Sequence, residues 1–345
     1  MAARASRRIE PGPILREVCL DPTTRVRLGR TAIEITRLGL GTAPLGGLYE
    51  AVSDTVAEAT VRAALDHGLG LVDTAPLYGY GLAEQRVGRV LAERERGSFV
   101  LATKVGRLLR NVALTEPLHP FVGAPDVSPV FDFSYDGVMR SLEESLERLS
   151  VDRVDILHIH DPDEHHDEAL EGAYRALDRL RAEGTIGAVG AGMNQSAMLA
   201  RFAREADFDC FLLAGRYTLL DQDALTELLP ICTQRNIAII AGGVYNSGLL
   251  ADPRPDAPYD YRQAPAPLLE QALQLRAVCD RHGVPLKAAA IQFPLGHPAV
   301  AGIVIGARAP DELVESIAMF RYPIPADLWG ELRSEGLLGA EVPTP

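Results

Sequence analysis

The chain has few of the features that mark secreted, metal-binding or membrane proteins. Its four cysteines, Cys19, Cys210, Cys232 and Cys279, lie far apart and form no Cys-x-x-Cys pair. The sequence therefore indicates neither a disulfide framework nor a zinc site. No basic-apolar signal segment opens the chain, and no apolar run reaches the length of a membrane-spanning helix. We expect a cytoplasmic protein in a reducing compartment, with no bound metal.

Blocks of like charge are also missing, apart from a small N-terminal cluster of Arg4, Arg7 and Arg8. The formal net charge of −13 is spread along the chain, which argues against a nucleic acid or an anionic membrane as partner. With 47% hydrophobic and 23% charged residues among 345, the chain can form a core of full size. We expect a small-molecule partner, and a monomer or a small homo-oligomer.

Short apolar runs alternate with amphipathic helical segments along most of the chain. Residues 1–25 show no such periodicity and are expected to form a flexible arm. Residues 26–35 alternate as a hairpin does, and residues 26–345 are expected to form a single domain. The expected strands are 38–41, 69–73, 99–104, 154–160, 186–191, 210–213, 237–241 and 303–305. The expected helices are 54–67, 83–94, 135–149, 167–182, 195–205, 222–234, 267–281, 286–295 and 310–319.

About eight strand–helix units close a parallel barrel. A doubly wound open sheet would instead bring a glycine-rich phosphate loop that opens a helix after its first strand. Residues 38–47 are glycine-rich but open no helix at that place, and no Walker-type sequence is present. The sequence thus predicts a (β/α)8 TIM barrel with an N-terminal hairpin. Two proline-rich connections, 105–134 and 251–267, should rise over its carboxyl face as long binding loops or lids.

Reactive side chains stand at the carboxyl ends of successive predicted strands. These are Asp73, Lys104 and His160, while Tyr78 follows Asp73 on a glycine-rich loop. Lys104 and Asp73 come from adjacent strands and are expected to pair. An ammonium near a phenol favours the phenolate, so we expect a lowered pKa for Tyr78 and proton exchange with a substrate oxygen. His158 lies deeper on the same strand face and is interpreted as core packing.

Two other classes of function stay open at this point. A lysine on a barrel strand can form a Schiff base, which would make Lys104 the centre of an aldolase. That chemistry needs neither Tyr78 nor Asp73 in this arrangement. A cofactor-binding regulatory subunit with little turnover is the other class.

These residues in their contexts resemble the aldo-keto reductase family. The segments Asp73-Thr-Ala-Pro-Leu-Tyr78-Gly and Ile159-His160-Asp-Pro, together with Lys104, look like its catalytic Asp/Tyr/Lys/His tetrad. The resemblance extends from about Val26 to about Phe320. Its finer features, in segments 42–49, 133–140 and 190–195, are similar to the sugar-oxidising branch. That branch includes L-fucose dehydrogenase, D-threo-aldose 1-dehydrogenase and pyridoxal 4-dehydrogenase.

The resemblance implies a nicotinamide cofactor, NADP or NAD, extended across the barrel rim. The positions it implies for cofactor binding are Thr42, Asp73, Asn194, Arg216, Gly243, Ser247, Gly248, Leu250, Gly306, Ala307, Arg308, Glu312 and Ser316. Arg308 could meet a 2′-phosphate. Glu312, however, stands where many NADP-using relatives have arginine, and an acid there would repel a phosphate and accept bonds from a ribose diol. The sequence does not choose between the two cofactors.

The resemblance also implies an activity and a set of substrate residues, Tyr49, Tyr78, His160 and Asp161. Asp161 stands where many reductases have tryptophan, and its carboxylate suits a polyhydroxy substrate, although it could also brace the loop before Pro162. We expect oxidation of the anomeric hydroxyl of an aldose of the L-fucose, L-galactose or D-arabinose type to a lactone, with Tyr78 as general base and His160 orienting the oxygen. Pyridoxal 4-dehydrogenation and general aldehyde reduction are the alternatives.

Overall fold

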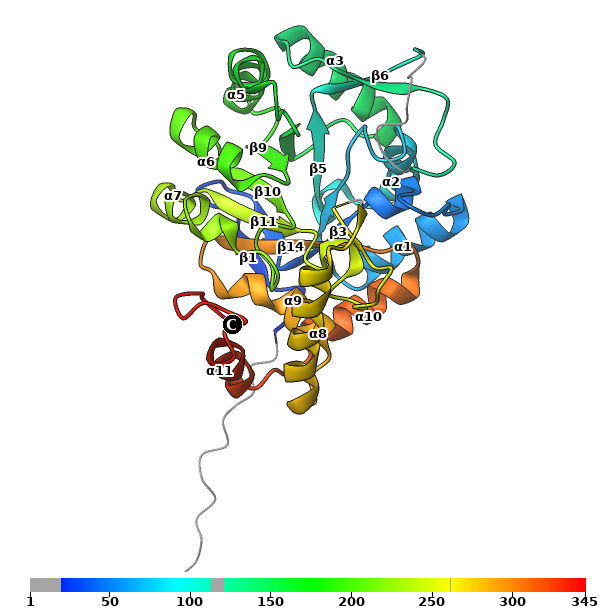
Figure 1. Cartoon of the computed structure of the whole chain (residues 1–345). Helices are drawn as coiled ribbons and strands as arrows, with labels where there is room; N and C mark the ends of the chain where they lie inside the picture. Colours follow the sequence, from blue (N-terminus) through cyan, green and yellow to red (C-terminus); the bar gives the residue numbers. More distant parts are fainter. Residues whose placement is uncertain (1–19, 113–120, 261) are drawn as a thin grey trace, which may run out of the picture.

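A closed barrel of parallel strands forms the centre of the molecule, seen in the computed structural model as Figure 1. The structure describes residues 20–112, 121–260 and 262–345. The barrel strands of this part are β3 (Leu38–Gly41), β4 (Leu71–Asp73), β5 (Val100–Val105), β8 (Ile156–His160), β9 (Ala188–Met193), β10 (Cys210–Ala214), β11 (Ala238–Gly242) and β14 (Val300–Gly306). They follow one another around the barrel in chain order, and β14 pairs with β3 to close it. The predicted (β/α)8 fold is confirmed.

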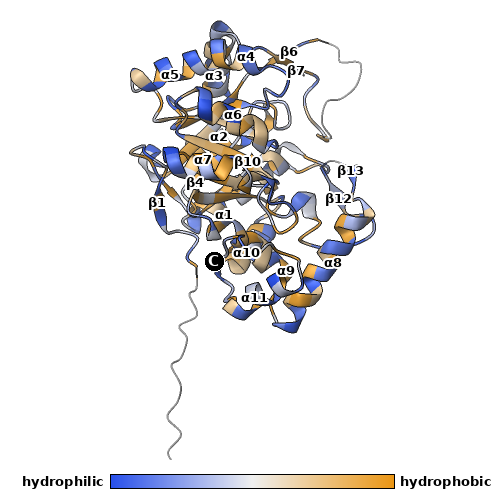
Figure 2. Ribbon diagram, turned by 60° about the vertical axis from the view of Figure 1, so that its left-hand side comes forward, coloured by the Kyte–Doolittle hydropathy of each residue, from blue (hydrophilic) through white to orange (hydrophobic). Residues whose placement is uncertain are grey.

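Helices surround the barrel and present their polar sides outward, as the hydropathy colouring of Figure 2 shows. They are α1 (Asp54–Asp66), α2 (Leu82–Leu91), α3 (Tyr135–Leu149), α4 (His166–Glu168), α5 (Arg175–Ala182), α6 (Ser196–Glu205), α7 (Leu228–Arg235), α8 (Ala266–Arg281), α9 (Leu286–Gln292), α10 (Pro310–Arg321) and α11 (Ala326–Ser334). A π-helical segment at Ala169–Tyr174 joins α4 to α5. α11 was not among the predicted helices. The helix predicted over 222–234 starts later, at Leu228, because a short 3-10 turn at Asp223–Leu225 precedes it.

The barrel strands are buried on both faces, which explains their continuous apolar runs. Side chains such as Leu71, Ala102 and Ile156 fill the inside of the barrel, and a larger apolar cluster lies between the strands and the helices. Leu28 and Ile35 belong to the inner cluster. Both lie within the predicted N-terminal hairpin, which is confirmed and which covers the amino end of the barrel.

Among the described residues, three antiparallel strand pairs lie outside the barrel sheet. They are β1 (Arg25–Arg27) with β2 (Glu34–Thr36), β6 (Arg107–Arg110) with β7 (Ser128–Phe131), and β12 (Pro258–Tyr259) with β13 (Arg262–Gln263). The last two occupy the long connections that follow β5 and β11, where the sequence showed no clear period. Residues 113–120 of the first connection, Tyr261 of the second, Cys19 and most of the expected N-terminal arm lie outside the described residues.

The described part of the chain contains no helix that is both long and apolar enough to cross a membrane. Within the same residues, no group of three or more His, Cys, Asp or Glu side chains is placed to hold a metal ion. Cys210, Cys232 and Cys279 are free, buried thiols. They pack as small apolar side chains, as expected for cysteines in these surroundings.

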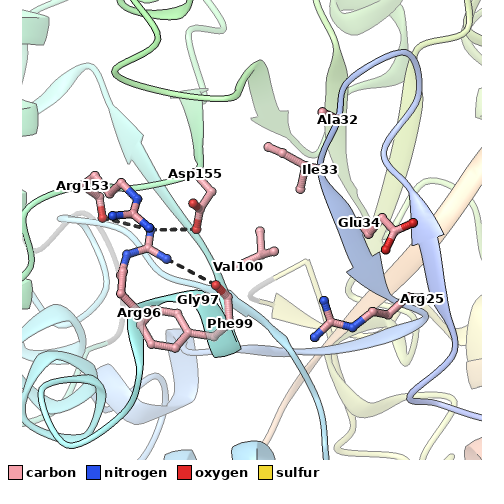
Figure 3. A pocket seen from close by; sticks show the side chains of 10 residues that line it. All are labelled: Arg25, Ala32, Ile33, Glu34, Arg96, Gly97, Phe99, Val100, Arg153 and Asp155. Carbon is pink, nitrogen blue, oxygen red and sulfur yellow. Dashed lines mark hydrogen bonds and ion pairs between the residues drawn. The ribbon is translucent and has the colours of Figure 1, made fainter.

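An ion pair ties two connections together at the amino end of the barrel (Figure 3). The Arg96 guanidinium donates to the Asp155 carboxylate at 2.8 Å, to the Arg153 carbonyl at 3.1 Å and to the Phe99 carbonyl at 3.2 Å. The same Asp155 oxygen accepts the Leu101 backbone N–H at 2.7 Å. Asp155 therefore joins the segments that lead into β5 and β8. Because barrel active sites lie at the opposite, carboxyl face, we interpret this contact as structural.

We predict that Asp155→Ala lowers the free energy of unfolding by about 1–3 kcal/mol, because two partly buried donors lose their acceptor. Thermal unfolding followed by circular dichroism should show a lower Tm, with turnover at 25 °C unchanged. Asp152→Ala is the matched control, since its side chain is 81% exposed and its ion pair with Arg153 spans 3.9 Å. Equal Tm values for the two variants would contradict the assignment.

Candidate active site

Three neighbouring strands bring reactive side chains to the carboxyl rim of the barrel. β4 ends at Asp73, β5 carries Lys104 one residue before its end, and β8 ends at His160. The strands pair in parallel, with Lys104 opposite His158 and Asp73 opposite Ala102. Parallel pairing places these strand ends on one rim, and the predicted convergence of Asp73, Lys104 and His160 is present in the structure.

Lys104 and Asp73 form a buried ion pair. The Lys104 ammonium lies 2.9 and 2.7 Å from the two Asp73 carboxylate oxygens, and it donates to the Thr74 carbonyl at 2.9 Å. The two side chains are only 1% and 3% exposed. Burial raises the pKa of Asp73, while the Lys104 ammonium opposes that rise. Each charge depends on the other, because an isolated buried charge is costly.

Tyr78 lies between Lys104 and His160. Its ring centroid is 4.6 Å from the Lys104 ammonium, which lies over the ring face. The His160 ring meets the Tyr78 ring edge to face, with 5.8 Å between centroids. A turn places the tyrosine, because its backbone N–H donates to the Ala75 carbonyl at 3.1 Å and its carbonyl accepts the Ala83 N–H at 3.1 Å.

The pKa of Tyr78 differs from the sequence-based expectation. Burial raises the pKa of this phenol well above its usual value, the carboxylates of Asp73 and Asp161 raise it further, and the Arg107 guanidinium opposes them. The predicted lowering by Lys104 is wrong, because that ammonium is engaged by Asp73 and lies over the ring face. Tyr78 therefore holds its proton at neutral pH and can donate it to a substrate oxygen.

Asp161 forms one wall of the site and is held by Arg107. Its carboxylate lies 3.2 Å from the Arg107 guanidinium and 3.5 Å from His160 Nε2. Its backbone has a φ of +40°, and its N–H donates to the Gly192 carbonyl at 3.0 Å. Burial raises the pKa of Asp161 to about 6, with Arg107 opposing the rise. Arg107 in turn stacks on Phe131, 4.6 Å from the ring centroid.

A cavity of about 810 Å³ connects this group to the loops that follow β11 and β14. Most of the residues predicted to bind cofactor or substrate line it, namely Thr42, Tyr49, Asp73, Tyr78, Lys104, His160, Asp161, Asn194, Gly243, Ser247, Gly248, Gly306, Arg308 and Glu312. The other predicted positions, Arg216, Leu250, Ala307 and Ser316, do not line it. The Arg216 guanidinium instead forms an ion pair with Asp260 at 2.6 Å.

The cavity has features that fit an extended dinucleotide. The Thr42 hydroxyl is buried without a hydrogen-bond partner among the described residues, and such a group calls for a ligand or a water. At Gly248, φ is +103° and no atom lies within 4 Å of where a side chain would begin. A phosphate group could therefore approach the backbone there closely. Thr42, Asn194, Ser247 and Gly248 are the described residues that would hold the cofactor.

A salt bridge lines the cavity where α10 begins, between Arg308 just before this helix and Glu312 in its first turn. The Glu312 carboxylate accepts from the Arg308 side chain at 2.5 and 3.0 Å and from its backbone N–H at 2.8 Å. The resemblance put both residues among the positions expected to bind the cofactor, and the structure pairs them at the cavity. Their contact gives the Arg308 guanidinium a carboxylate partner of its own.

Sequence reasoning missed several residues of the cavity and its walls. Phe121 and Arg254 line it from the two long connections, and Arg107 supports Asp161 from the first of them. The length of those connections signalled a functional loop. No local pattern in the sequence distinguished these residues from their neighbours, because their positions depend on how each hairpin folds back over the rim.

Comparison with known proteins agrees with this geometry. The Aldo/keto reductase family matches residues 37–335. Pyridoxal 4-dehydrogenase from Microbacterium luteolum is 44% identical over 343 residues, covering 92% of this chain and 99% of the relative. D-threo-aldose 1-dehydrogenase from a Pseudomonas species is 42% identical over 331 residues, covering 94% and 99%. A solved aldo-keto reductase from Bacillus halodurans superimposes with a TM-score of 0.71 at 25% identity, covering 92% and 97%.

The family match and the two relatives extend over nearly all of the chain, including the barrel and the strand ends that carry the reactive residues. The resemblance proposed from the sequence is confirmed. The enzymes of this family are oxidoreductases that use a nicotinamide cofactor and act on CH–OH groups. This chain belongs to the aldo/keto reductase family.

Proposed function

We propose that the protein is an aldose 1-dehydrogenase, which oxidises the anomeric hydroxyl of a cyclic aldose to a lactone. The observation that carries this proposal is the Asp161 carboxylate, held by Arg107 at 3.2 Å and lying 3.5 Å from His160. A carboxylate accepts hydrogen bonds from neighbouring hydroxyls, as a sugar diol would offer them. A wall of this kind suits a polyhydroxy substrate.

In this mechanism Tyr78 and His160 hold the substrate oxygen between them. A bound oxidised nicotinamide supplies the acceptor for the hydride that leaves the anomeric carbon. Tyr78 takes the hydroxyl proton in oxidation and returns it to a carbonyl oxygen in reduction. Since burial and nearby carboxylates raise the pKa of Tyr78, its phenolate is scarce at neutral pH. Oxidation should therefore accelerate as the pH rises, whereas reduction uses the form already present.

Pyridoxal 4-dehydrogenation is the second candidate, and two observations favour it. The relative with that activity is 44% identical to this chain. Leu48 and Phe121, which form an isolated bridge, give the cavity an apolar side on which an aromatic ring could pack. The same pair of oxygen-binding residues, Tyr78 and His160, would serve a hemiacetal on such a ring.

The geometry gives little support to a Lys104 aldolase. A Schiff base requires a neutral amine that can reach a carbonyl carbon. The Lys104 ammonium is instead 1% exposed and is held by Asp73 and the Thr74 carbonyl. Borohydride reduction in the presence of substrate tests this directly, because Lys287 is the one other lysine of the sequence. A stable adduct on Lys104 would support the aldolase.

The function is tested by comparing kcat/KM for L-fucose, L-galactose, D-arabinose, L-xylose and pyridoxal with NAD⁺ and NADP⁺. We expect an aldose to give the highest value.

Tyr78→Phe should lower kcat by about 10²–10⁴-fold, because it removes proton transfer, while the Kd of the cofactor measured by calorimetry stays unchanged. Near-wild-type turnover in that variant would sink the mechanism, and turnover of pyridoxal alone would select the second candidate.

A second prediction concerns the pH dependence of substrate binding. With its pKa raised to about 6, Asp161 is ionised above that pH and protonated below it. The KM of the wild-type enzyme for its aldose should therefore rise as the pH falls from 7.5 to 5. Asp161→Asn should raise KM at pH 7.5 by about ten- to a hundredfold, since a hydrogen bond to a charged group is lost, and should make KM insensitive to pH in this range.

The neighbouring acid provides the control for Asp161. Asp163 hydrogen-bonds with Gln195, and its charge contributes to the raised pKa of Asp161. Asp163→Asn should keep the KM at pH 7.5 and move the acid limb of the profile slightly lower. A wild-type KM profile in Asp161→Asn would show that Asp161 does not contact the substrate.

A third prediction separates the structural role of the Lys104–Asp73 pair from its role in catalysis. Lys104→Met leaves a buried carboxylate without its cation and should lower the free energy of unfolding by about 3–5 kcal/mol. Adding Asp73→Asn removes the charge and should restore most of that loss in urea unfolding. Turnover should stay low in both variants, because Tyr78 has lost the ammonium that lies over its ring. Wild-type turnover in the double variant would contradict a role in the reaction.

A further inference from the structure

A contact between distant parts of the chain lies at the adenosine end of the cavity. Glu50, on the loop after β3, places its carboxylate 2.5 Å from Nη1 of Arg308. Glu312 occupies Nε and Nη2 of the same guanidinium at 3.0 and 2.5 Å. Two carboxylates, one on the loop after β3 and one on α10, thus share one arginine. Nothing in the local sequence around Glu50 indicates this partner, which is 258 positions away.

The residue before Glu50 fixes the same loop to the opposite side of the cavity. Tyr49 has a φ of +66°, and its phenol hydrogen-bonds with the Ser247 side chain. Tyr49, Ser247 and Arg308 all line the cavity. The loop reaches this position because β3 and β14 are paired neighbours, with Gly41 opposite Gly306. Residues 49–50 therefore bridge the loops that follow β11 and β14.

The charges at this end of the cavity favour a neutral ligand group. Arg308 contributes one positive charge, and Glu50 and Glu312 contribute two negative ones. Two further cations are already paired: Lys287 with Glu315 at 2.8 Å, and Arg254, which also lines the cavity, with Asp252 at 3.3 Å and Asp256 at 3.1 Å. A ribose 2′-hydroxyl can donate to either glutamate, whereas a 2′-phosphate brings further negative charge and must compete with both carboxylates for Arg308.

We propose that Glu50 is a cofactor-selecting residue, which pairs with Arg308 across the mouth of the cavity and thereby favours NAD over NADP. This inference rests on the proposed function, since it takes the cavity to hold a nicotinamide dinucleotide. Glu312, in the first turn of α10, lies four positions after Arg308 and forms a local pair with it. Glu50 is the partner that occupies the remaining Nη1 and makes the group negative overall.

The test measures binding of nucleotide fragments to the full-length protein by titration calorimetry, so that it does not depend on turnover. The ligands are ADP, 2′,5′-ADP, NAD⁺ and NADP⁺. In Glu50→Gln, the Kd for 2′,5′-ADP and NADP⁺ should fall by about two- to fivefold, the size expected for a largely exposed ion pair. The Kd for ADP and NAD⁺ should stay within error. The gain should shrink in 0.5 M salt, because exposed charges are screened.

Two further variants test whether the gain in affinity depends on Arg308 or follows from the loss of any negative charge. Glu93→Gln removes a glutamate that is 56% exposed and pairs with Arg62 at 2.7 Å, away from the cavity, so it should change none of the four Kd values. Arg308→Gln combined with Glu50→Gln should lose the gain for 2′,5′-ADP, since the released guanidinium is the group that binds the phosphate.

The outcomes distinguish this inference from the function on which it rests. An unchanged ratio of 2′,5′-ADP to ADP affinity in Glu50→Gln would overturn the role of Glu50 and leave dinucleotide binding intact. A wild-type protein that binds none of the four ligands would instead contradict the proposed function itself.

Discussion

The buried ion pair between Lys104 and Asp73 is the interaction on which the rest of the site depends. Both side chains are almost fully excluded from water, and neither charge could remain there without the other. The pair also sets the position of the ammonium over the Tyr78 ring. Tyr78 in turn presents its ring to His160 edge to face. A single electrostatic contact between two adjacent strands thus places a cation against Tyr78, the residue that we propose exchanges a proton with the substrate.

Asp161, on which we base the proposal of a sugar substrate, also raises the pKa of Tyr78. Asp161 offers a hydrogen-bond acceptor at the cavity wall, and its charge helps to raise the pKa of Tyr78. Arg107 acts on both, because it pairs with Asp161 and opposes the rise in the pKa of Tyr78. In the proposed reaction, substrate recognition by Asp161 and the proton affinity of Tyr78 are therefore coupled. A change that alters one of these side chains will act on both properties.

The strand ends could be predicted from the sequence because parallel strands deliver their carboxyl ends to one rim, whatever the loops do. This rule alone was enough to predict that Asp73, Lys104 and His160 lie together. Arg107 and Glu50 did not follow from it, since their partners lie 54 and 258 positions away and depend on how loops cross the rim. The predicted direction of the pKa shift of Tyr78 was wrong for a related reason. The sequence indicates which charges lie nearby, but not that the ammonium faces the ring and pairs with Asp73.

The two ends of the cavity are built from parts of the chain that are synthesised at different times. Asp73, Lys104 and His160 come from β4, β5 and β8, which are consecutive neighbours in the sheet. The adenosine end lies instead across the junction of β3 with β14, the first and last barrel strands. A growing chain could assemble the proton-transfer group from its first half. It would gain the bridge between Glu50 and Arg308 only after the last strand had joined the first, so nucleotide affinity reports on a completed barrel.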